Sequence, residues 1–220
     1  MLSIWFIFIN LLTIYISYPL VEYYLFMYYD KFQKYDRKRK NYIIKNIIKA
    51  QVLKYLSIAT IPIIPFVLFG VGNVTKCVHF IGCLYTSGDT IALFKDMNMS
   101  YSTKIHHIIT TSLSLVNLFI DWSNPHNIAK MMGVYCILSC YSYNVNYCLG
   151  KRFLTFEFQY KELKKNAFIT YFFCCGVNWT LHIIYFLYNI QKLDIITISY
   201  YGVICLIVYD DIILLRWLQT

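Results

Sequence analysis

The apolar residues of this chain gather in long runs that short polar segments separate. Seven runs stand out, at residues 2–29, 50–72, 74–94, 105–120, 128–149, 167–190 and 195–218. A helix needs about 20 predominantly apolar residues to cross the hydrocarbon core of a membrane. Six runs reach that length, and the fourth does so when it is extended at each end. The pattern predicts an all-α membrane protein, a single bundle of about seven transmembrane helices.

The segment between the first two runs is strongly basic. Residues 30–49 contain eight Lys and Arg, and residues 41–49 repeat pairs of apolar residues at helical spacing. That spacing is typical of a helix that lies in the membrane interface. We therefore expect an N-terminal span at 1–29, a basic cytosolic linker at 30–49, and a transmembrane domain over 41–218. The first run lacks the basic flank and cleavage site of a signal peptide, so we expect it to be retained.

The distribution of Lys and Arg predicts the orientation of the spans. The first, third and fifth linkers and the C-terminal end contain 16 of the 20 basic residues, whereas the second, fourth and sixth linkers contain three. Because cytosolic loops carry the excess of Lys and Arg, the N-terminus should lie in the lumen or outside the cell and the C-terminus in the cytosol. We expect an endomembrane location such as the endoplasmic reticulum.

Composition supports a membrane protein and bears on the partners. The chain is 59% apolar with a mean hydropathy of +0.51, and 14% of its residues are charged, against about a quarter in soluble domains. Its net charge of +9 lies between the apolar runs, where it would meet anionic headgroups. Membrane lipids are therefore the expected partners, and nucleic acid is not. The eight cysteines show no metal-ligand spacing, so no metal or resident cofactor is expected.

Three ionisable residues inside the apolar runs stand out. Asp89 lies near the end of the third run, and His106 and His107 open the fourth. An ionisable side chain at the centre of a span costs about 2.5–3.5 kcal/mol on insertion scales and often marks a functional site. The intervening linker is short, so we expect the three side chains to converge on the cytosolic side of the bundle. Adjacent helical residues point about 100° apart, which predicts one histidine facing the bundle and the other the interface.

These three residues admit a chemical and a structural interpretation. A carboxylate can orient an imidazole and tune its pKa for general base catalysis. The same groups could instead form a buried hydrogen-bonded tether between two helices. They are too few for a metal site, and two adjacent histidines on one helix cannot easily share an ion.

Other polar residues inside the runs are expected to be structural. His79 and His182 are lone histidines on apolar helices, and Asp210 or Asp211 should face the bundle, paired with Arg216 one to two turns away. Asparagines in the fifth and sixth runs could hydrogen-bond between helices; they are Asn144, Asn146 and Asn178. Asn73 belongs to the one glycosylation sequon that is expected in a non-cytosolic loop.

A motif within the third and fourth runs resembles the TLC-domain family, which includes the ceramide synthases. It consists of Tyr85-x-Ser87-x-Asp89, followed about twenty residues later by His106-His107-Ile108-x-Thr110. The resemblance is specific from Tyr85 to Leu115 and looser from Asn41 to Arg216. It implies a many-span membrane protein with a lumenal N-terminus and a role that involves lipids.

Parts of the family pattern are absent. Ceramide synthases carry two aspartates three residues apart shortly after the paired histidines, whereas the first acidic residue here is Asp121. Many non-synthase members carry a Glu and a Pro in the next span. The corresponding segment of this chain, residues 139–144, contains neither. The resemblance therefore implies the fold and a lipid role more strongly than it implies acyl transfer.

Three functions remain open. The first is a lipid-handling or membrane-composition protein that binds lipid in its helix bundle, with Tyr85, Ser87 and Asn144 supporting the site. The second is an acyl-CoA-dependent lipid N-acyltransferase, an enzyme in which His106 or His107 is the base and Asp89 orients it. In that case acyl-CoA is a co-substrate. The third is a seven-helix receptor; a retinal protein is excluded because the last run, 195–218, lacks the lysine of a Schiff base.

Headgroup or phosphate contacts are expected from the fifth linker. Lys151 and Arg152 follow the fifth run directly, on the predicted cytosolic side. Cations at that depth can meet the phosphates of lipid headgroups or of coenzyme A.

Overall fold

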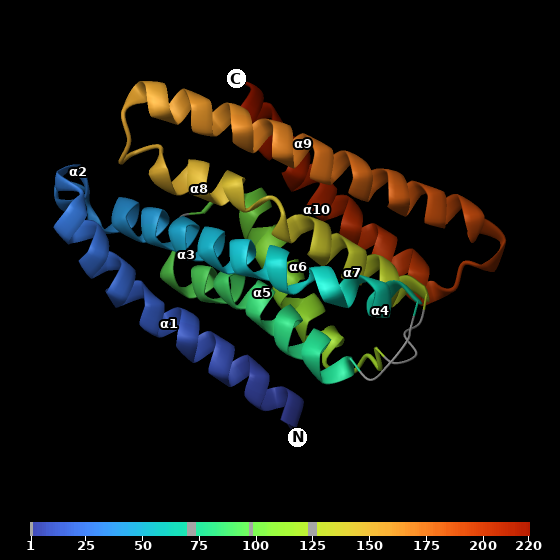
Figure 1. Ribbon diagram of the computed structural model, residues 1–220. Coiled ribbons are helices and arrows are strands. Elements are labelled where there is room, and N and C mark those ends of the chain that lie inside the picture. Colours follow the sequence, from blue (N-terminus) through green and yellow to red (C-terminus); the bar gives the residue numbers. More distant parts are fainter. Residues whose placement is uncertain (1, 70–73, 97–98, 123–126) are drawn as a thin grey trace.

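A computed structural model describes residues 2–69, 74–96, 99–122 and 127–220. The described chain is all-helical, with no strand (Figure 1). In chain order the α-helices are α1 (Leu2–Tyr28), α2 (Asp30–Gln33), α3 (Arg37–Ala59), α4 (Ile64–Phe69), α5 (Thr75–Lys95), α6 (Tyr101–Asn117), α7 (Asn127–Cys140), α8 (Tyr143–Lys151), α9 (Glu157–Tyr188) and α10 (Ile195–Gln219). Two 3₁₀ turns, η1 (Ile61–Ile63) and η2 (Ile190–Lys192), complete the set.

Four of the described helices are long and apolar enough to cross a membrane. They are α1, α5, α9 and α10, and a bent pair of α3 with the helix after it makes a fifth. The predictions of an all-α fold and of a membrane protein are confirmed at this level. Two predicted spans do not form such a helix. The fourth gives α6, which has 17 residues, and the fifth is divided between α7 and α8.

The second apolar run bends where its prolines lie. Helix α3 ends at Ala59, and the chain continues through η1 into α4 at an angle of 46°. Pro62 and Pro65 lack the N–H that would extend the α-helical ladder. The backbone N–H and the hydroxyl of Thr60 both donate to the Leu56 carbonyl, at 2.9 and 2.8 Å.

The break in the fifth run lies at Tyr141 and Ser142. Their backbone N–H groups donate to carbonyls three residues earlier, and the Ser142 hydroxyl donates to the Ser139 carbonyl at 2.7 Å. Serine competes in this way with the helical ladder. The predicted single span at 128–149 is therefore two shorter helices, because apolar composition alone does not reveal the interruption.

The basic linkers meet at one end of the bundle. Lys31 donates to the Thr155 carbonyl and Tyr35 to the Phe153 carbonyl. Lys45 forms an ion pair with Asp96. The first basic linker thus contacts both the third and the fifth. Figure 1 shows α2, the start of α9 and the C-terminus near this end, and the end of α9 at the opposite one.

The second half of the basic segment is not a separate interfacial helix. Helix α3 runs without a break from Arg37 to Ala59. Asp36 caps it, since its carboxylate accepts a hydrogen bond from the Arg39 backbone N–H at 2.8 Å. The basic linker is consequently continuous with the second apolar run. This continuity places Lys45 and Lys49 inside the bundle rather than on its surface.

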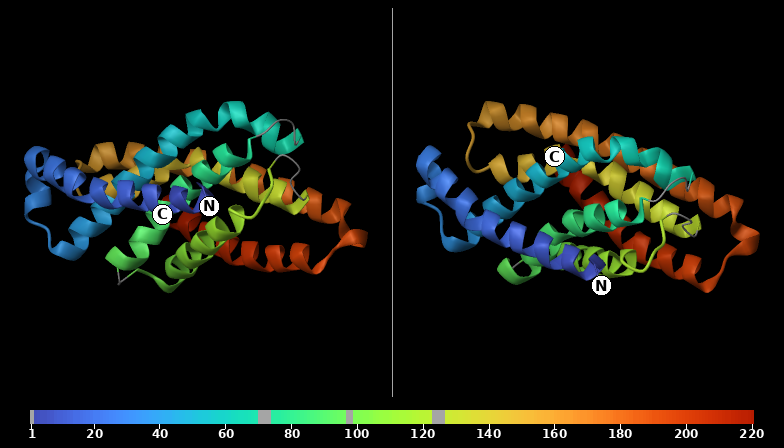
Figure 2. Two further views of the ribbon diagram at one scale, coloured as in Figure 1. Left: turned by 90° about the horizontal axis from the view of Figure 1, so that it is seen from below. Right: turned by 60° about the horizontal axis from the view of Figure 1, so that its bottom comes forward.

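Close packing at one glycine joins α3 to α8. A Cβ at Gly150 would meet Ile47 Cγ1 at 2.9 Å and the Ile43 carbonyl oxygen at 3.4 Å. Glycine therefore permits the two backbones to approach. On the outside of the bundle, α1, α9 and α10 expose large apolar side chains such as Trp5, Phe173 and Ile196. Figures 1 and 2 show α1 and α9 along opposite flanks, where such faces suit contact with lipid tails.

Candidate functional site

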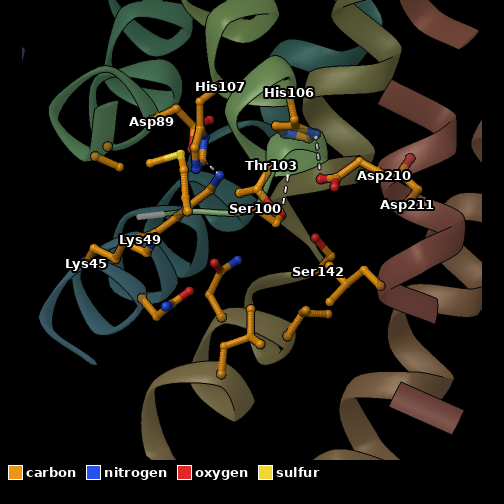
Figure 3. A pocket seen from close by; sticks show the side chains of 18 of the residues that line it. Lys45, Lys49, Asp89, Ser100, Thr103, His106, His107, Ser142, Asp210 and Asp211 are labelled. Atoms are coloured by element: carbon orange, nitrogen blue, oxygen red, sulfur yellow. Dashed lines mark hydrogen bonds and ion pairs between the residues drawn. The ribbon is translucent and has the colours of Figure 1, made fainter. Parts of the chain in front are cut away.

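A polar cavity lies within the bundle, toward the end where the basic linkers meet. Its volume is about 790 Å³, and side chains of α3, α5, α6, α7, α8, α9 and α10 line it. Five basic and five acidic residues contribute to the lining; they are Lys38, Arg39, Lys45, Lys49, Arg152, Asp36, Asp89, Asp96, Asp210 and Asp211. Figure 3 shows several of them around the cavity. A cavity with so many charges is unusual among apolar helices, where buried charges are costly.

Asp89 is the most deeply buried charged group of the cavity, with 0% of its side chain exposed. Lys49 forms an ion pair with its Oδ1 oxygen, and the Thr110 hydroxyl donates to Oδ2 at 3.3 Å. His107 Nδ1 lies 2.8 Å from Oδ1. The last contact is within ion-pair distance, although its alignment falls outside hydrogen-bond geometry. Three helices, α3, α5 and α6, thus converge on one carboxylate.

The two histidines point to different partners inside the same cavity. His107 points to Asp89, whereas His106 Nδ1 lies 3.4 Å from Asp210 Oδ2 on α10 (Figure 3). Both side chains line the cavity. The expectation that one histidine faces the membrane interface is therefore wrong. Helix α6 packs against both α5 and α10, so residues 100° apart on it each meet a neighbouring helix.

Asp211 is held by two tyrosines at the wall of the cavity. The hydroxyls of Tyr135 and Tyr171 donate to its two carboxylate oxygens, each at 2.6 Å. Asp211 faces the bundle as predicted, and Asp210 does so too. The exposed Arg216 has no ion pair with either aspartate among the described residues. Hydrogen bonds from neutral tyrosines satisfy this buried carboxylate in place of a salt bridge.

The predicted supporting residues divide into those that reach the cavity and those that do not. Tyr85 and Arg152 line it. Ser87 does not, because its hydroxyl donates to the Cys83 carbonyl of its own helix at 2.6 Å. Asn144 does not line the cavity either, whereas Asn146 does. Lys151 is also outside the lining, and its ammonium group lies 5.4 Å from the centre of the Tyr147 ring.

Sequence reasoning missed the role of α3 in this site. Lys49 was assigned to a linker, yet it pairs with Asp89, and Lys45 pairs with Asp96. A signal was present, since Lys45 and Lys49 are four residues apart and share one helical face. Tyr135 and Tyr171 were also missed. No local spacing relates these two residues, which contact Asp211 from different helices.

The remaining histidines have structural partners, as expected. His79 Nε2 lies 2.8 Å from the Ile120 carbonyl oxygen. His182 contacts the Asn178 carbonyl oxygen and the Tyr200 hydroxyl at 2.9 and 3.1 Å. Asn73 lies outside the described residues, so its predicted glycosylation stays a prediction.

A second, smaller pocket adjoins the polar cavity. Its volume is about 70 Å³ and its lining is almost entirely apolar. Tyr85 and Tyr135 line both spaces. The two tyrosines are therefore a common wall of the cavity and of the apolar pocket.

The arrangement supplies acid–base chemistry and charge recognition. Nδ1 of His107 lies beside the Asp89 carboxylate, which leaves Nε2 as the ring atom for proton exchange with a bound molecule. In the part of the chain that the structure describes, no group of three His, Cys, Asp or Glu could hold a metal ion.

Comparison of the chain with protein-family models, with curated proteins and with solved structures found no match. Function must therefore be argued from the site itself.

Proposed function

We propose that this protein binds a membrane lipid in its polar cavity and acts in lipid handling or in setting membrane lipid composition. The observation that carries the proposal is a cavity of about 790 Å³ with buried charges inside a bundle of apolar helices. Ion pairs at that depth are expensive to maintain. A polar headgroup in the cavity would use them, and an acyl chain would extend along apolar helix faces.

The contacts of Asp89 support binding rather than a purely structural role. A purely structural hydrogen-bonded link between α5 and α6 would require only Asp89, Thr110 and one of the two histidines. Here His106 also points into the cavity, toward Asp210. The resemblance to the TLC-domain family centres on the same positions and agrees with a lipid ligand.

The experiment is to purify the protein in a mild detergent and to identify co-purified lipid by mass spectrometry. We expect one lipid class to be retained at near one molecule per protein and to be enriched over its share of the source membrane. Retention of bulk lipid in membrane proportions, or of none, would contradict the proposal.

A second function, acyl transfer from acyl-CoA to a lipid amine, is favoured by the pair of Asp89 and His107. Their contact of 2.8 Å resembles the arrangement of a general base and its orienting carboxylate. In this mechanism His107 accepts the proton of the attacking amine, the amine nitrogen bonds to the thioester carbon, and the thiol of coenzyme A leaves with a proton. Release of free thiol from acyl-CoA, dependent on a long-chain amine, tests this function.

We also propose the seven-span arrangement, with a lumenal or external N-terminus, a cytosolic C-terminus and an endomembrane location. Support comes from the grouping of the linkers. The first basic linker contacts the third and the fifth at one end of the bundle. Thr75 and Asp121, from the second and fourth linker regions, are joined by a hydrogen bond of 3.0 Å away from that end. Reporters fused to the two termini test the arrangement, and finding both on one side of the membrane would refute it.

A further inference from the structure

Two guanidinium groups lie against one aromatic ring at the mouth of the cavity. The central carbon of Arg39 is 5.0 Å from the centre of the Phe153 ring, and that of Arg152 is 4.5 Å from it. All three residues line the cavity. Arg152 also lies over Tyr42 and Trp217, at 4.9 and 5.4 Å. Aromatic faces thus hold two like charges near each other.

No carboxylate neutralises this pair within the described part of the chain. Neither arginine has a salt bridge there. The nearby Asp36 side chain accepts the Arg39 backbone N–H, and Asp96 is paired with Lys45. The Nε atom of Arg152 is buried and has no hydrogen-bond partner. An anionic ligand in the cavity would instead neutralise the two guanidinium groups that line it.

The local fold positions Arg152 and turns Lys151 away. Gly150 lets α8 approach α3 closely, which brings the residue two positions later against Tyr42 of α3. Arg152 caps the C-terminal end of α8. The neighbouring Lys151 lies over Tyr147 and does not line the cavity. Of two adjacent basic residues, one therefore belongs to the site.

We propose that Arg39 and Arg152 form a binding subsite for a phosphate ester carried by the ligand of the cavity. The inference rests on the proposed function, since it names the chemical class of the headgroup. Guanidinium groups bind phosphate oxygens through paired N–H donors, and stacking on aromatic rings keeps them in position. The phosphate could belong to a lipid headgroup or to a water-soluble ester such as coenzyme A.

The test measures binding by the purified full-length protein. Short-chain phosphatidic acid and the matching diacylglycerol form the lipid arm, and coenzyme A forms the soluble arm. We expect wild-type protein to prefer a phosphate ester in at least one arm. Arg152→Gln should weaken that binding about tenfold or more, whereas Lys151→Gln should leave it unchanged. Arg39→Gln provides a second variant if Arg152→Gln does not fold, as judged by its melting temperature.

The outcomes separate the two proposals. Preference for phosphatidic acid assigns the phosphate to a lipid, and preference for coenzyme A assigns it to a soluble ester. Equal binding of phosphatidic acid and diacylglycerol, with no binding of coenzyme A, would overturn the subsite but leave lipid binding intact. Unchanged phosphate binding by the folded arginine variants would also overturn the subsite. Absence of lipid binding in wild-type protein would refute the proposed function. The effect of the arginine variants on coenzyme A binding would still test the phosphate subsite.

Discussion

Neutralising Asp89 should destabilise the protein by leaving Lys49 without a counter-charge. In Asp89→Asn the side-chain shape is kept, but the ammonium group of Lys49 loses its carboxylate partner. Breaking a buried ion pair by removing one member typically costs about 3–5 kcal/mol. Asp89 is fully buried, whereas 19% of the Lys49 side chain remains exposed. We therefore expect a loss at the lower end of that range, about 3 kcal/mol.

A double-mutant cycle isolates this interaction. Lys49→Met alone leaves Asp89 with Thr110 and His107, and the double variant Asp89→Asn with Lys49→Met removes both charges. The double variant should be more stable than the sum of the single losses predicts, by about 2 kcal/mol. Reversible unfolding in mixed detergent micelles supplies the free energies. Lys54→Met is the matched control: Lys54 is exposed on the same helix, so its effect should stay within about 0.5 kcal/mol.

Additive effects in this cycle would refute the reasoning. If the single losses sum to the double loss, Lys49 and Asp89 do not interact in the folded protein. A large effect of the Lys54 control would show that the unfolding measurement reports on something other than the ion pair.

Two further predictions concern packing and the role of the histidine. Gly150→Ala should destabilise by about 1–3 kcal/mol, because its Cβ would lie 2.9 Å from Ile47; a melting temperature equal to wild type would contradict that contact. His107→Gln should lose lipid binding or turnover while its melting temperature stays near wild type, since even a well-formed interhelical hydrogen bond contributes only about 0.6 kcal/mol. Loss of activity only in proportion to loss of folded protein would instead make His107 a structural residue.

The sequence predicted the convergence of Asp89 and His107 because their relation is nearly local. A short linker joins the two helices, and polar residues in apolar runs are expected to face inward. The bend at Pro62 was predictable for a similar reason, because proline acts on its own helix. The orientation of the spans stays a prediction, which rests on the distribution of basic residues and not on contacts.

The parts of the site that were missed depend on contacts between distant segments. Lys49 was placed in a linker because its neighbours are basic, and its partner is 40 residues away in the sequence. Tyr135 and Tyr171 meet Asp211 across 76 and 40 residues. Tyrosine is abundant in this chain, with 22 residues, so its presence in a run carries little information.

Helical phase explains the errors between near neighbours. Asn144 and Asn146 are two residues apart, and Lys151 and Arg152 are adjacent, yet one of each pair lines the cavity. A difference of one residue turns a side chain by about 100°. The break near Ser142 shifted that phase, and apolar composition continues across it. The side of the helix on which each residue after the break lies could therefore not be assigned from the apolar pattern of the run.

Filling the cavity without changing any charge tests the central claim most directly. Gly88 lines the cavity, and a Cβ there would meet no atom within 4 Å. Gly202 has equally open surroundings but lies exposed on α10, outside the cavity lining. The measurement is the amount of co-purified lipid per folded protein in Gly88→Leu and in Gly202→Leu. Loss of the lipid from Gly88→Leu with retention in Gly202→Leu is the predicted result, and equal retention in both variants would contradict a lipid site in this cavity.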